Sequence, residues 1–203
     1  FHYNWRFFWD YCNTELGNQG VHMLDVAMLA IQKMRGVENS LPTHVSGNSG
    51  IYWVHDAKEV PDTQVMSYDY GDFMLTWELQ SFQRKHKLEG SDAGTAFYGT
   101  EGTLMVDNSG WKVAEQGIQH PAGEVWLLPH MKNFFECLKT RQRPNGDVEI
   151  GRLSTTLTHL GNICTKLGRD VRFDPKTETF GADKQANALL TKQYRAPYTL
   201  PKV

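Results

Sequence analysis

The chain has 203 residues, of which 40% are hydrophobic and 22% charged, and its formal net charge is −2. This balance is typical of a soluble globular domain with a core of its own. The scattered basic residues disfavour nucleic acid and anionic membranes as partners. No apolar run approaches the ~20 residues of a membrane span. No signal peptide is visible either, so the compartment stays open between cytoplasm and export to the periplasm.

The cysteines and histidines give no sign of a metal or disulfide framework. Cys12, Cys137 and Cys164 are far apart in the sequence, and no Cys-x-x-Cys occurs. Free thiols are therefore expected. The histidines lack the spacing of metal ligands, so we predict no metal site.

The first part of the chain predicts a loop followed by a helix. Residues 7–14 are aromatic and polar without a clear period. From about Gly17 to Lys33, apolar residues recur at helical spacing, and Gly36 marks the stop. The apolar stripe of this helix consists of Val21, Leu24, Met28 and Ile31.

The middle of the chain changes to the two-residue period of half-buried strands. Pro61-Asp62 and Gly71-Asp72 supply turns, and Gly99-Thr100-Glu101-Gly102 is typical of a tight hairpin connection. Short strands with short links favour an antiparallel meander. The expected strands cover residues 44–54, 63–70, 73–79, 93–98 and 103–106.

Helical period returns in the last third of the chain. One face of an expected helix consists of Met131, Phe134, Phe135 and Leu138. A longer helix is expected over 150–167, ended by Gly168, and a last one over 183–192, before an extended tail. We therefore predict a single domain over residues 1–203 with an α+β fold. Helices would cover one face of an open, mainly antiparallel sheet.

The other face of that sheet is expected to pack against a second copy of the chain. An open sheet with one bare apolar face is prone to association unless something covers it. The residues that motivate this prediction alternate along the strands: Phe73, Leu75, Trp77 and Leu79, with Met66 and Tyr68 or Tyr70. We therefore expect a homo-oligomer formed through the sheet face.

The sequence contains no Gly-x-Gly-x-x-Gly and no P-loop. These glycine-rich turns form the phosphate cradle of most dinucleotide and nucleoside triphosphate sites. The chain alone is therefore expected to bind no nucleotide cofactor.

The sharpest local feature lies at the start of the first expected helix. Asn18 and His22 are four residues apart, so a helix would place them on one face, with Asp25 three residues further. Such a pair can bind vicinal hydroxyls, because the amide donates and accepts while a neutral imidazole can accept a proton. The spacing alone favours the alternative interpretation, in which His22 is a structural histidine and Asn18 an early-turn polar residue.

Several segments, in this order along the chain, resemble the C-terminal domain of the Gfo/Idh/MocA (glucose–fructose oxidoreductase / inositol dehydrogenase) family. The similarity begins with a Trp-Asp-Tyr motif that continues to Gly-Asn-Gln-Gly-Val-His, although Cys12 and Thr14 replace two glycines of the family loop. It covers nearly the whole chain. The segments that carry it are 9–22, 97–104, 130–141, 160–163, 168–169, 173–175, 186–187 and 194–197.

The resemblance implies a parent protein of two domains. An N-terminal Rossmann domain, absent from this chain, would bind NAD or NADP, and the present domain would close the substrate pocket. The implied fold is similar to the C-terminal domain of glyceraldehyde-3-phosphate dehydrogenase. Because the sequence starts at Phe1 and already reads like the inside of a domain, we expect a fragment or a processed chain.

The resemblance also implies roles for individual residues. His22 aligns with the proton-accepting histidine of the family, and Asn18 stands where many members have a catalytic aspartate. Asparagine cannot ionise, so Asn18 is expected to hold a substrate hydroxyl. The neighbouring residues expected to contact substrate are Trp9, Asp10, Tyr11, Asn13 and Gln19.

The leading functional reading is thus a domain of a nicotinamide-dependent oxidoreductase that acts on a sugar, cyclitol or glycoside. A redox-assisted glycosidase or lyase would use the same residues, since oxidation beside the anomeric centre permits elimination. A non-catalytic module for assembly or sugar binding is the alternative from another class.

Overall fold

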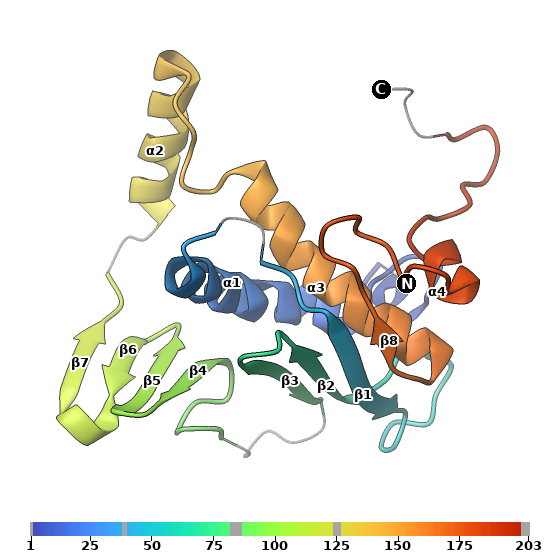
Figure 1. Cartoon of the computed structure of the whole chain (residues 1–203), viewed down its shortest axis with the longest axis horizontal. Coiled ribbons are helices and arrows are strands. Elements are labelled where there is room, and N and C mark those ends of the chain that lie inside the picture. The colour runs from blue at the N-terminus through green and yellow to red at the C-terminus, as the bar shows by residue number, and fades with distance from the viewer. Residues whose placement is uncertain (1, 38–39, 82–86, 124–126, 200–203) are drawn as a thin grey trace.

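The computed structural model describes residues 2–37, 40–81, 87–123 and 127–199 (Figure 1). Phe1 and the end of the tail beyond residue 199, which entered the predictions above, lie outside these ranges. Over the described residues the chain forms helices and antiparallel strands, so the predicted α+β class is confirmed. The main elements are α1 (Val21–Arg35), β1 (His44–Gly50), β2 (Thr63–Asp69), β3 (Met74–Gln80), β4 (Gly94–Gly99), β5 (Gly102–Asp107), β6 (Gly110–Val113), β7 (Ile118–Pro121), α2 (Leu127–Thr140), α3 (Val148–Leu167), β8 (Val171–Arg172) and α4 (Lys184–Ala188).

The strands form two open sheets rather than the one meander expected. The first has the order β3-β2-β1-β8 and the second the order β4-β5-β6-β7. Strands that follow one another in the sequence pair as hairpins. In the first sheet, Thr63 of β2 pairs with Gln80 of β3, and in the second, Gly99 of β4 pairs with Gly102 of β5. A two-residue period of apolar side chains identifies strands, but it does not show which strands pair with each other. The division into two sheets was therefore not visible in the sequence.

Several boundaries differ from those expected. The first helix starts as a π-helical turn over Leu16–Gly20 before α1, and the last helix is only the short α4. Strands β6, β7 and β8, each of four residues or fewer, were not expected. Segments this short have at most two residues on each face, and no predicted hairpin turn adjoined them, unlike residues 103–106.

The core lies between the first sheet and the helices α1 and α3. Hydrophobic side chains of these elements are buried together, including Met28, Leu157 and Tyr68. Gly161 permits the close approach, because a Cβ there would lie 2.5 Å from the Tyr68 hydroxyl oxygen. The apolar stripe predicted for α1 contributes Leu24, Met28 and Ile31 to this core, as expected.

The residues expected to form a subunit interface face this core instead. Met66 and Tyr68 are fully buried, and Leu75 and Trp77 pack against the same cluster. The opposite face of the sheet presents mostly polar side chains, such as Thr76. The alternation correctly grouped residues on one face, but it could not tell which face the helices cover.

Helix α2 stands apart from the rest of the molecule (Figure 1). None of its 14 residues is buried. It is nevertheless amphipathic, with its apolar side chains on one stripe and exposed: Leu127, Leu128, Met131, Phe134, Phe135 and Leu138. Neither α2 nor any other helix of the described ranges is long and apolar enough to span a membrane.

Candidate functional site

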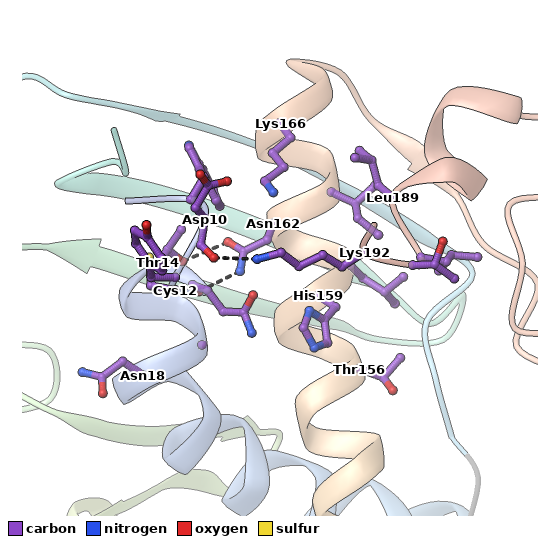
Figure 2. A pocket seen from close by; sticks show the side chains of 18 of the residues that line it. Asp10, Cys12, Thr14, Asn18, Thr156, His159, Asn162, Lys166, Leu189 and Lys192 are labelled. Carbon is purple, nitrogen blue, oxygen red and sulfur yellow. Dashed lines mark hydrogen bonds between the residues drawn. The ribbon is translucent and has the colours of Figure 1, made fainter. Parts of the chain in front are cut away.

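A cavity of about 1020 Å³ lies between the N-terminal loop, α3 and the segment that follows α4 (Figure 2). Its walls therefore come from the two ends of the chain. Aromatic, amide, hydroxyl and cationic side chains line it together. The lining includes Trp5, Trp9, Asp10, Tyr11, Cys12, Asn13, Asn18, Thr156, His159, Asn162, Lys166, Lys192 and Tyr194.

The N-terminal wall of the cavity is fixed by a turn at Thr14. This residue has a φ of 60°, in the left-handed region that β-branched residues rarely adopt. Its hydroxyl donates to Asn162 Oδ1 at 2.9 Å and accepts from the Leu16 amide at 3.1 Å. Asn162 also donates from its Nδ2 to the Asn13 carbonyl at 2.7 Å. These buried bonds hold the strained turn where the resembled family loop carries glycine.

Asn162 is a structural residue of the cavity wall. Its side chain is buried and both ends of its amide are used by the loop. Asp25 is exposed and accepts a short hydrogen bond from the Ser154 hydroxyl. Both residues thus link the N-terminal region to α3.

Trp9 forms an aromatic wall beside two lysines. The Lys166 ammonium lies 4.4 Å from the centroid of the Trp9 ring. The Lys192 ammonium donates to the Asp10 carbonyl at 2.5 Å. The Trp9 backbone N–H donates to the Glu59 carboxylate at 2.9 Å. Both cations and the loop are therefore held in a defined arrangement around the opening (Figure 2).

His159 is the histidine that faces the cavity, and the sequence reasoning did not single it out. It projects from α3 between Thr156 and Lys192 (Figure 2). Burial lowers its pKa, and the Lys166 charge lowers it further. The imidazole is therefore neutral near pH 7 and can donate and accept hydrogen bonds to hydroxyl groups. The available signal was the polar stripe of α3, where His159 and Lys166 are seven residues apart.

Some of the site residues predicted from the N-terminal motif line the cavity, and others lie outside it. Trp9, Asp10, Tyr11, Asn13 and Asn18 line the cavity. Figure 2 shows the Asn18 amide on the side of its helix away from α3, where it donates to the Glu15 carboxylate at 3.0 Å.

His22 and Gln19 are exposed and lie outside the lining residues. His22 lies in the first turn of α1, one helical turn beyond Asn18 at the cavity rim. It is therefore accessible from solvent or to another domain.

The strand pairing of the described residues differs from that of the usual dinucleotide-binding unit. All their strand pairs are antiparallel, so this part of the chain contains no parallel βαβ unit with a phosphate-binding turn.

Residues 1–200 match the family described as "Oxidoreductase family, C-terminal alpha/beta domain" (GFO_IDH_MocA_C2). The chain belongs to this family. The match confirms the resemblance identified from the sequence motifs. No curated protein matches the chain.

Solved structures share the fold of this family member at low sequence identity. The WlbA dehydrogenase of Bordetella pertussis, solved with NADH and UDP-GlcNAcA, is 17% identical with a TM-score of 0.57, over 84% of this chain and 48% of its own. An oxidoreductase of Thermotoga maritima is 12% identical with a TM-score of 0.60, over 88% and 49%. One from Agrobacterium radiobacter, solved with NAD⁺, L-tartaric acid and magnesium, is 13% identical with a TM-score of 0.53, over 75% and 47%. The chain thus spans about half the length of these proteins.

Proposed function

We propose that this chain is the substrate-binding domain of a nicotinamide-dependent oxidoreductase that acts on a sugar, cyclitol or glycoside. The observation that supports this most is the cavity, which combines an aromatic wall at Trp9 with the polar groups of Asn13, Thr156 and His159. A sugar ring needs such a combination, since it has an apolar face and a rim of hydroxyls. The NADH and UDP-GlcNAcA bound by the Bordetella pertussis dehydrogenase are consistent with it.

In this proposal the cavity binds the sugar ring of the substrate, and a residue beside the cavity rim takes part in proton transfer. The Trp9 ring packs against the substrate, and neutral His159 and Asn13 hold its hydroxyls. His22 would accept the proton of the reacting hydroxyl, and a nicotinamide held by another domain would supply the hydride acceptor. Asn18, between the cavity and His22, orients a neighbouring hydroxyl.

The nicotinamide itself, as NAD or NADP, would be held by a second domain. A comparison of chain lengths supports this, because the present chain covers only 48% of the WlbA dehydrogenase, which was solved with NADH. An N-terminal Rossmann domain fitted against the rim would bring the nicotinamide to the side on which His22 is exposed.

The test is to express the protein from its complete reading frame and to assay NAD⁺ and NADP⁺ reduction with a panel of sugars, cyclitols and glycosides. Reduction with at least one polyhydroxylated substrate is expected. Release of aglycone without net reduced nicotinamide would instead identify a redox-assisted glycosidase or lyase. Binding of sugars with neither reaction would identify a non-catalytic module.

Self-association through the first sheet stays a prediction. The apolar residues that motivated it pack against the core, so the available face offers a partner mainly polar side chains, with Val65 and Met74 as exposed apolar ones. Light scattering of the purified protein at tens of micromolar checks it, and a monomer at that concentration would contradict it.

A further inference from the structure

Two lysine ammonium groups converge on the cavity from different elements. Lys166 extends from the last turn of α3, and Lys192 from the segment after α4 (Figure 2). Neither forms an ion pair with a carboxylate within the described ranges. The arginine at the same cavity is different, because Arg6 is paired with Glu15 at 3.0 Å. The two lysines therefore contribute positive charge that no described residue neutralises.

Their present contacts position the lysines without exhausting their donors. Lys166 lies over the Trp9 ring, and Lys192 makes one hydrogen bond, to the Asp10 carbonyl. An ammonium group has three N–H donors, so Lys192 retains donors for a ligand and Lys166 retains all of its own. Fixing such long side chains costs conformational entropy, and their contacts with the loop offset part of that cost before any ligand arrives.

The carboxylates at the cavity leave this positive charge in place. Glu178 lines the cavity but accepts two hydrogen bonds from Arg152, at 3.0 and 2.8 Å. Asp10 is exposed, and it presents its carbonyl oxygen to Lys192.

We infer that the cavity recognises an anionic oxygen group, a carboxylate or a phosphate, carried by the sugar-like substrate, and that Lys166 and Lys192 bind it from two sides. This inference rests on the proposed function. It places the charged end of the substrate between α3 and the segment after α4, with the ring against Trp9. The substrate class is therefore an acidic or phosphorylated sugar.

Calorimetric titration of the full chain at low ionic strength tests the inference with four probes: D-glucuronate, D-glucose 6-phosphate, D-glucose and NAD⁺. At least one anionic sugar should bind about 10-fold or more tighter than glucose, since charge-assisted bonds exceed neutral ones. Lys166→Gln and Lys192→Gln should each weaken its binding by about 10-fold. Glucose binding should weaken less than anionic-sugar binding in both variants.

Lys132→Gln on α2 is the matched control, because Lys132 is exposed and remote from the cavity. It should leave all binding unchanged, and the melting temperature of every variant should match that of the parent. Tighter binding of D-glucuronate would identify a carboxylate as the preferred group, and tighter binding of D-glucose 6-phosphate would identify a phosphate.

Equal affinity for glucose and both anionic sugars would overturn the inference and leave the proposed function standing. So would lysine variants that bind the anionic sugars as the parent does. Lysine-dependent binding of NAD⁺ would overturn it by assigning the pair to the cofactor. Absence of binding by every sugar would count against the inference and the proposed function together.

Discussion

The hydroxyl of Thr14 donates a 2.9 Å hydrogen bond to the side-chain oxygen of Asn162, which lies 148 positions later in the sequence. Through this bond and a second one to the Asn13 carbonyl, one side chain of α3 fixes two consecutive residues of the cavity wall. Because both side chains are buried, water cannot replace either partner. The shape of the candidate site therefore depends on a contact between two distant parts of the chain.

Replacing Asn162 with alanine should destabilise the protein by about 2–3 kcal/mol, because it removes two hydrogen bonds and leaves the buried Thr14 hydroxyl proton without its acceptor. Urea unfolding measures the change. Asn18→Ala is the control, since that amide is exposed and should cost less than about 0.5 kcal/mol. Equal effects of the two substitutions would show that the Thr14 turn does not need Asn162.

Asp62 should control stability in acid. Its carboxylate is 4% exposed and accepts backbone N–H groups from Tyr52, Trp53 and Val54 as well as the Lys58 ammonium. Burial raises the pKa of Asp62, but these hydrogen bonds outweigh it and hold the pKa well below the ordinary 3.8.

A lowered folded-state pKa means that the contribution of Asp62 is complete above pH 3.8 and is lost as the pH falls below that value. Asp62→Asn should cost about 2–4 kcal/mol at pH 7 and flatten the acid slope of stability below pH 3.8. Unfolding free energies measured from neutral to acidic pH check both effects. Asp56→Asn, in the same loop but exposed, should leave the slope intact.

His22 and His159 should differ in their kinetic roles in the protein expressed from the complete reading frame. His22→Ala should lower turnover by about 10²–10⁴-fold, the usual worth of a positioned proton acceptor, and leave the melting temperature unchanged because the side chain is exposed. His159→Ala should mainly raise KM, because its role is to hold the substrate. Lost stability with full turnover of the folded His22→Ala protein would end the proposal for that residue.

Helix α2 should be almost indifferent to truncation of its apolar side chains. Phe135 is 53% exposed, so Phe135→Ala should change stability by less than about 0.5 kcal/mol. Leu157 on α3 is fully buried, and Leu157→Ala should cost about 2.7–5 kcal/mol. Chemical denaturation compares the pair. A large effect of Phe135→Ala would reveal that α2 packs against something in solution.

The fold class and most elements could be predicted because they depend on local patterns. The apolar stripe of α1 is visible in the sequence, and so is the end of α3 at Gly168, which adopts a φ of 62°. The pairing of strands into two sheets could not be predicted. Neither could the burial of the face that carries Trp77, because that depends on where α1 and α3 pack.

The candidate site was predicted from one of its two walls. The N-terminal motif identified Trp9 and Asn13, which line the cavity. The other wall, with His159, Lys166 and Lys192, was missed, because nothing local in the sequence of α3 or of the last segment shows that they approach the N-terminal loop. Helical spacing reveals a polar stripe, but only the tertiary contact makes it part of a site.

The construction of the cavity from both ends of the chain has a consequence for synthesis on the ribosome. Residues 5–18 emerge early, whereas the α3 wall and Lys192 follow only after strands β1 to β7 have been made. The site has a high contact order, since its closing contacts span nearly the whole sequence. A nascent chain that stops before α3 can therefore contain every residue of the N-terminal motif and still have no place for a ligand.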